Sequence, residues 1–535
     1  MKNSIQIFVF CSSLIIIKVL SFNCGTNELN HIKPHKVSLP RKSRKLNDVY
    51  SPIKIKMDYT LLDSQEQNED LKNRVKNVLD KTVSDFESLL SVQHFNFLYR
   101  REHFKDFCGI EKYSPDYEKW GQTYDLAIIP YFNQSLYTST IQAAATACIA
   151  ITETMQPKMG IIMINPNLDF SYKNSEKFLE LLFLHEMSHV LIFHPSFFIY
   201  LDMLGQKTVN RERIYYIKSP KVLEKAKIHF GCNSIDGIPL ENYGGQGSAG
   251  SHWEARYMLG DYMISTDYPE IVISDITLAV FEDSGFYKVN YYTGGLFRFG
   301  KGEGCNFFNE KCITNGGTLF ANEFCVKSQT PFCTSAHLAK GHCYMAKYNT
   351  ELDSQYQYFS DKRVGGYAPA DYCPISFDNL YDKTNYYFVT NCKIGKQNTI
   401  HQDYGEKFGD NSICVESSLV PSSSDQASIY RSICYEASCN KDTKNVILSI
   451  GGLKVVCPME GGTIENPNGC KGKVRCPDYN SVCTSEVWCN DPIDCIEKKI
   501  VADESSYSYS YQLPTSLKSQ YINGLSLFSY LLLFL

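Results

Sequence analysis

The sequence predicts an α+β fold, in which strands accompany long apolar helices, followed by a disulfide-rich, loop-rich C-terminal region. Three runs have the composition of strands, namely 52–59, 124–130 and 160–164. Apolar residues recur at helical spacing through 65–90 and again from about 175 to 193. Sixteen of the 21 cysteines fall between Cys305 and Cys495. Disulfides and loops are therefore expected to hold the C-terminal part as much as an apolar core does.

The second of these helices carries the most informative motif of the chain, H-E-x-x-H, formed by His185, Glu186 and His189. Residues four apart lie on one face of a helix. The two imidazoles can therefore bind one metal ion, while the glutamate stands beside an open coordination position as a base. The rest of the helix is strongly apolar, so an unpartnered histidine pair would be unfavourable there. The motif thus predicts metal-assisted hydrolysis.

Length and composition limit the class of protein. The chain has 535 residues, of which 43% are hydrophobic and 21% charged, and its net charge is −5. This length predicts two or three domains, and this composition predicts a globular protein. The small net charge argues against general nucleic-acid binding, so we expect no nucleic-acid partner.

The N-terminus has the pattern of a secretory signal peptide over residues 1–22, in which a short basic start precedes an apolar run. An uncleaved anchor is the alternative, and Lys18 within the run disfavours it. Residues 23–48 are polar, with a basic cluster at 41–45, and are expected to form a short pro-segment. A solvated linker is the alternative.

Residues 501–535 combine a polar spacer with an apolar tail that is too short to cross a bilayer as a helix. This pattern is typical of a GPI-attachment signal, with Ser506 or Ser516 as the attachment point, and a buried or frayed end is the alternative. The 20 cysteines after the signal peptide indicate an oxidising compartment. We therefore expect the secretory pathway, and a protein that is extracellular or bound to the cell membrane through a GPI anchor.

Between the two ends, motifs and composition divide the chain into four parts. Residues 49–194 are expected to form an N-terminal catalytic subdomain with the motif helix. Residues 195–300 form an insertion that supplies further site residues. A Cys-rich C-terminal domain is expected at 301–456, and six closely spaced cysteines predict a small stapled module at 457–500.

A zinc hydrolase needs a third protein ligand in addition to the histidine pair. His194 is near, but it lies one position short of the third histidine in the pattern H-E-x-x-H-x-x-G-x-x-H, where this chain has Pro195. His252 follows a Gly-rich loop, and glycines let the backbone approach a packed site in conformations that other residues resist. We expect His252 to be the third ligand, and Glu254 is the alternative.

Eleven residues beyond His252 comes Met263, within Gly-Asp-Tyr-Met. With this methionine, the H-E-x-x-H motif and the segments 248–254 and 278–287, the chain resembles the leishmanolysin-like metallopeptidases from about Cys108 to the 390s. These are metzincin zinc proteases with a mixed sheet, an active-site helix and a long insertion before the third histidine. The resemblance implies protein or peptide substrates and one bound Zn²⁺. It also implies zinc ligands His185, His189 and His252, a general base Glu186 and a Met-turn at Met263.

The chain departs from the family pattern at Ile192 and around Cys24. Ile192 replaces the glycine that ends the helix in the family, so either the helix continues to Pro195 or the backbone is strained. The family's pro-segment carries a cysteine that blocks the zinc, and Cys24 has a suitable place for that role, although its neighbours match poorly. If Cys24 leaves with a pro-segment, 19 cysteines remain, an odd number.

The implied activity is that of a zinc-dependent endopeptidase, in which Glu186 assists the attack of a zinc-bound water on a peptide bond. By analogy with the family, 160–164 is expected to be an edge strand that holds an extended peptide. One alternative is a catalytically idle cell-surface adhesion protein that keeps the scaffold. Another is a gluzincin-type peptidase with Glu254 as the third ligand.

Overall fold

The computed structural model describes residues 23–24, 35–37, 49–137, 141–168, 175–209, 212–243, 248–266, 268, 270–291, 297–377, 390–393, 404–425, 427–467 and 469–483. The expected signal peptide, most of the expected pro-segment, loop residues 244–247 and the whole expected GPI signal lie outside these residues. No helix within the described part is long and apolar enough to cross a membrane.

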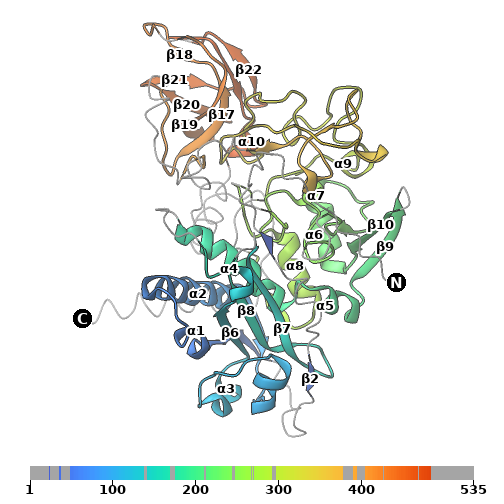
Figure 1. The fold of residues 1–535 in the computed structure, drawn as a ribbon. Coiled ribbons are helices and arrows are strands. Elements are labelled where there is room, and N and C mark those ends of the chain that lie inside the picture. The colour runs from blue at the N-terminus through green and yellow to red at the C-terminus, as the bar shows by residue number, and fades with distance from the viewer. Residues whose placement is uncertain are drawn as a thin grey trace, which may run out of the picture.

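A six-stranded mixed sheet forms the centre of the N-terminal half (Figure 1). Its strands are β1 (Asn23–Cys24), β2 (His35–Val37), β4 (Ile55–Met57), β6 (Leu126–Phe132), β7 (Ile141–Ile151) and β8 (Pro157–Ile164). Strands β4, β6 and β8 are parallel, whereas β7 is antiparallel to β8. The expected strands at 124–130 and 160–164 are confirmed as β6 and β8. The expected strand at 52–59 is divided between β3 (Tyr50–Pro52) and β4.

The expectation that 160–164 is an edge strand is wrong. All eight residues of β8 are buried, and the strand lies between β7 and β6 with backbone pairing on both sides. A continuous apolar run of this kind is typical of a central strand that is covered on both faces. Beyond β8 lies β7, whose other edge pairs, among the described strands, only with the short strands β1 and β2.

Helices cover both faces of this sheet. The long helices α2 (Glu69–Leu89) and α4 (Ser175–Leu191) pack on one face and confirm the two helices expected from the apolar spacing. An ion pair of 2.7 Å between Lys81 and Glu180 joins them. On the other face, α3 (Tyr117–Thr123) contributes Trp120 to a second apolar cluster. The Cys108–Cys148 disulfide links this cluster covalently to β7.

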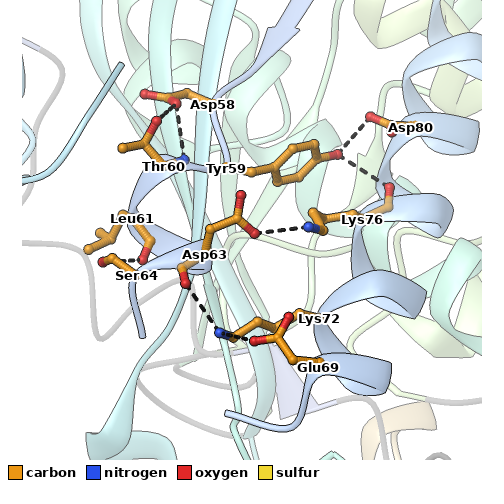
Figure 2. Close-up of polar contacts among 10 residues, drawn as sticks. All are labelled: Asp58, Tyr59, Thr60, Leu61, Asp63, Ser64, Glu69, Lys72, Lys76 and Asp80. Carbon is orange, nitrogen blue, oxygen red and sulfur yellow. Dashed lines mark hydrogen bonds and ion pairs between the residues drawn. The ribbon is translucent and has the colours of Figure 1, made fainter. Parts of the chain in front are cut away.

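The start of α2 is held to the short helix α1 (Thr60–Asp63) by polar contacts (Figure 2). Lys72 Nζ donates to the Asp63 carbonyl at 3.2 Å, and Lys76 Nζ lies 2.9 Å from the Asp63 carboxylate. The Tyr59 hydroxyl donates to Asp80 at 2.7 Å. These contacts fix α2 against the end of β4.

Helix α4 approaches β8 very closely at Gly160. A Cβ at this position would lie 2.3 Å from Cγ1 of Val190, a β-branched residue with little rotamer freedom on a helix. We therefore expect Gly160→Ala to lower the free energy of unfolding by about 1–3 kcal/mol, because α4 must move away from the sheet. Urea unfolding checks this. Val190→Ala should suppress much of the effect, and Gly317→Ala, at an open position, is the matched control.

The chain from 195 to 377 contributes to the same core, a single apolar cluster whose members extend from Ile53 to Phe377. Its main elements are α5 (Pro195–Tyr200), the hairpin β9 (Leu204–Val209) and β10 (Glu212–Ile217), α6 (Pro220–Phe230), β11 (Ile238–Pro239), α7 (Ala255–Met258), α8 (Asp275–Asp283) and α9 (Asn306–Asn309). Strand β12 (Tyr287–Val289) pairs with β5 (Leu90–Gln93), and β5 pairs with β3. Residues 301–377 therefore share the core of the N-terminal half.

A second six-stranded sheet lies at the far end of the molecule (Figure 1). It consists of β17 (Ser412–Ser417), β19 (Arg431–Asn440), β20 (Asn445–Ile450), β21 (Leu453–Val456), β22 (Gly462–Glu465) and β24 (Lys473–Cys476). The short helix α10 (Tyr479–Val482) follows. Strands on both sides of the expected boundary at 457 pair in this one sheet around one apolar core. Among the described residues there are eight disulfides, six of them within 312–483, and the buried Cys470 forms none of them.

Candidate metal centre

Helix α4 places His185 and His189 on one face, and both side chains are buried. Their Nε2 atoms lie 3.0 Å apart. Glu186 follows His185 on the helix and is also fully buried. The structure therefore brings the expected ligand pair together and places the expected base directly beside it in the chain.

His252 reaches this pair from a segment 63 residues beyond His189. Its Nε2 atom lies 3.2 Å from Nε2 of His185. Backbone pairing fixes the segment, because Glu241 N donates to the His252 carbonyl at 2.9 Å and Trp253 N donates to the Met263 carbonyl at 3.0 Å. Within the described residues, His185, His189 and His252 are the one group of three or more His, Cys, Asp or Glu side chains whose possible ligand atoms all lie within 4.8 Å of one another.

The outward nitrogen of each ring is held by a backbone carbonyl. The hydrogen-bond distances are 2.7 Å from His185 Nδ1 to Tyr262 O, 2.6 Å from His189 Nδ1 to Phe193 O and 2.9 Å from His252 Nδ1 to Ser248 O. A carbonyl oxygen can only accept, so each Nδ1 carries a proton. In the neutral ring each Nε2 then presents a lone pair to the others.

Three converging lone pairs repel one another unless a cation lies between them. Tetrahedral zinc binds imidazole nitrogen at about 2.0–2.1 Å, which separates two such ligand atoms by roughly 3.3 Å. The observed 3.0 and 3.2 Å fit that separation. Carbonyl partners on the far nitrogen are also typical of metal-bound histidine. The residues present therefore fit a zinc ion bound through three Nε2 atoms.

Burial keeps these histidines neutral, as metal binding requires. Loss of solvation lowers the pKa of His185 to about 4 and that of His252 to about 3. The pKa of His189 is well below its ordinary value for the same reason, and its two neighbours lower it further.

The end of α4 needs no residue in the left-handed conformation, although Ile192 stands where the family has a glycine. Helix α4 ends at Leu191, and Ile192 is not among the described residues with positive φ. Instead, Phe193 N donates to Ser188 O at 2.7 Å, a bond one residue longer than the helical repeat. This turn directs the Phe193 carbonyl toward His189 Nδ1, so the helix end itself orients a candidate ligand.

The two alternative ligands have other roles. His194 is the N-cap of α5, where its Nδ1 accepts from Ser196 N at 3.2 Å. Glu254 is the N-cap of α7, where Oε1 accepts from Arg256 N at 3.1 Å. Neither belongs to the three-histidine group.

Met263 is buried in a turn that touches both ligand segments. Its carbonyl accepts from Trp253 N, and the preceding carbonyl of Tyr262 accepts from His185 Nδ1. Sequence reasoning identified Met263 but missed Tyr262, Phe193 and Ser248, because they act through backbone oxygens. Cys24 lies in β1, opposite Ala143 of β7. Contact between its thiol and the histidines stays a prediction.

His194 should make stability depend on pH. Burial lowers its folded pKa to about 4, whereas the unfolded value is near 6.5. Between about pH 6.5 and 4, His194 is therefore protonated in the unfolded chain but neutral in the folded chain. As pH falls from 6.5 to 4, the free energy of unfolding of the parent should fall by up to about 3 kcal/mol relative to that of His194→Asn, which keeps a capping oxygen. Urea unfolding of both proteins in chelator checks this, and an unchanged difference across the range would contradict it.

The chain is similar to known proteins of one family. The chain is 27% identical over 413 residues to a leishmanolysin homolog of Crithidia fasciculata, which covers 74% of this chain and 61% of the relative. It is 26% identical over 360 residues to leishmanolysin of Leishmania tropica, which covers 65% and 53% respectively. A leishmanolysin-like peptidase of Caenorhabditis elegans is 29% identical over 323 residues, with 52% and 47% covered.

The chain thus spans between about half and three fifths of the length of these relatives. The sequence model of the leishmanolysin family matches residues 68–489, which include all three histidines. Because that match extends over most of the chain, the protein belongs to the leishmanolysin family.

Proposed function

We propose that this protein is a zinc-dependent endopeptidase of the metzincin type that cleaves protein or peptide substrates. The observation that carries the proposal is the convergence of three Nε2 atoms whose rings are fixed by carbonyl oxygens. Zinc, when bound there, supplies the Lewis acidity that acidifies water and polarises a peptide carbonyl.

Glu186 is the general base in this proposal. Glu186 directly follows the candidate ligand His185 in α4, and its side chain is fully buried. It takes the proton of the attacking water and passes it to the leaving amine.

The substrate strand is assigned to β7 in place of β8. If β1 and β2 were removed, β7 would be the edge strand of the sheet and could accept an extended peptide by strand addition. In this structure its outer edge pairs with β1 near Ile141 and with β2 near Ile149. The Lys36 ammonium of β2 also lies 4.5 Å from the ring centre of Tyr200. Strands β1 and β2 would thus cover the substrate strand, as expected of a pro-segment.

Removal of the residues up to the basic cluster 41–45 should therefore raise peptidase activity by at least about tenfold. The reason is that a substrate must otherwise displace two short strands from β7. Activity before and after trimming, measured on one preparation, checks this. Inhibition could come from the Cys24 thiol blocking the zinc or from β1 and β2 covering β7. Cys24→Ser separates the two, because it removes the thiol but keeps the strand pairing. Equal activity before and after trimming would contradict the assignment.

We also propose that the protein is exported and acts at the cell surface or outside the cell. Eight disulfides within the described residues support an oxidising compartment. The GPI anchor rests on the sequence pattern alone. Release of the protein from cells by a phosphatidylinositol-specific phospholipase tests it.

The endopeptidase proposal is tested on trimmed protein purified from a secretory host. Zinc content should be one ion per chain, and a denatured protein substrate should be cleaved. A zinc chelator should abolish cleavage, and added zinc should restore it. A protein that binds zinc but cleaves nothing would favour the idle adhesion protein instead.

A further inference from the structure

A buried carboxylate holds the turn that carries Met263. Asp261 is fully buried, and its Oδ1 accepts from Met263 N at 2.7 Å. Its Oδ2 accepts from the Thr277 hydroxyl at 2.7 Å and from Ser274 N at 3.3 Å. A buried carboxylate is tolerated only when donors surround it, and these donors come from the first turn of α8, whose positive end favours an anion.

The same hydroxyl is shared with the segment of the third histidine. Trp253 is fully buried directly after His252, and its Nε1 donates to Thr277 Oγ1 at 2.7 Å. Thr277 has one hydroxyl proton, which it donates to Asp261, so the direction of each hydrogen bond is fixed. The side chains form one relay from Trp253 through Thr277 to Asp261.

The backbone closes this relay into a ring. Trp253 N donates to the Met263 carbonyl at 3.0 Å, and Met263 N donates to Asp261. Both backbone groups of Met263 are thereby used. The ring cannot open at one bond without leaving a buried polar group unpaired.

The ring also touches the helix that supplies the other two histidines. Tyr262, between Asp261 and Met263, accepts from His185 Nδ1 through its carbonyl. Its hydroxyl pairs with the Ser188 hydroxyl at 2.8 Å. One turn therefore contacts α4 through Tyr262 and the His252 segment through Trp253.

We propose that Asp261 and Thr277 are positioning residues for the zinc centre, which set the distance between His252 and the two histidines of α4. Neither residue touches the histidines, so both act through the Asp261–Met263 turn and Trp253. The proposal rests on the proposed zinc site and adds residues that hold its geometry. Groups that hydrogen-bond a metal ligand directly typically change metal affinity 10–100-fold when they are removed, and Asp261 and Thr277 act one contact further from the ligands.

The test uses the full chain with Thr277→Val, which keeps the shape and removes the shared hydroxyl. Two readouts are independent of peptidase activity: the rate of zinc release to a chromophoric chelator, and the visible absorption of the cobalt(II)-substituted protein. We expect Thr277→Val to release zinc up to about tenfold faster, the lower end of the effect of a direct ligand partner, and to shift the cobalt bands. Thr277→Ser should behave as the parent does, because it restores the hydroxyl.

A matched control separates positioning from loss of stability. Thr82 is another fully buried threonine, whose hydroxyl donates to Val78 O within α2, away from the metal centre. Thr82→Val should lower the melting temperature but leave zinc release and the cobalt spectrum unchanged. If Thr277→Val does not fold, Trp253→Phe, which removes the indole N–H and leaves a smaller apolar ring in its place, should also speed zinc release.

Zinc release within twofold of the parent, with an unchanged cobalt spectrum in the folded variants, would overturn the proposal. A parent protein that binds no zinc would instead refute the proposed function. The two failures are therefore distinguishable.

Discussion

Glu186→Gln should lower kcat/KM for a protein substrate by about 10²–10⁴-fold while zinc stays bound. Glutamine has the shape of glutamate but cannot accept the proton of the attacking water. The three histidines and their carbonyl partners are unchanged by the substitution, so the metal should be retained. Cleavage of a denatured protein substrate and metal analysis of the same sample measure the two effects.

A conservative change at a comparable buried carboxylate supplies the control. Glu180 lies on the same helix, is buried and pairs with Lys81, but it lies more than a turn before His185. Glu180→Gln should therefore cost stability rather than catalysis. If Glu186→Gln kept more than one tenth of the parent activity, the role of general base would have to be reassigned.

The ligand pair could be predicted from the sequence because its geometry is local. Spacing of four residues on an apolar helix suffices to place His185 and His189 on one face. The prediction of His252 as the third ligand depended on a Gly-rich loop and on the family resemblance, because no sequence periodicity relates His252 to the helix. The groups that orient the rings could not be predicted, because any residue offers the same carbonyl.

Two further differences arise from pairing between distant strands. The apolar run at β8 predicts burial, but it does not say whether one or two neighbours flank the strand, and the structure shows two. The sequence predicts a loop-rich region held by disulfides at 412–476, whereas strands from this region form a six-stranded sheet. Several of its strands have only four to six residues, and strands of that length leave little periodicity in a sequence.

His252→Ala should weaken zinc binding by roughly 10²–10³-fold, because one of four positions around the metal is lost. Four-ligand structural zinc sites are worth about 10–16 kcal/mol, or about 2.5–4 kcal/mol for each ligand. Competition with a chelator of known affinity measures the change. Glu254→Ala is the matched comparison, since Glu254 is a buried N-cap outside the three-histidine group and its loss should leave zinc bound. The reverse result would make Glu254 the third ligand.

Thermal unfolding then distinguishes a lost ligand from a damaged fold. Zinc that binds only the folded state stabilises it by about 4 kcal/mol when its free concentration is 1,000 times Kd. A chelator should therefore lower the melting temperature of the parent clearly, but that of His252→Ala very little. Without zinc, the two proteins should melt at similar temperatures, since a small side chain replaces a neutral ring whose Nε2 faces other lone pairs. A variant that melts far below the metal-free parent would show that His252 is needed for folding as well as for the metal.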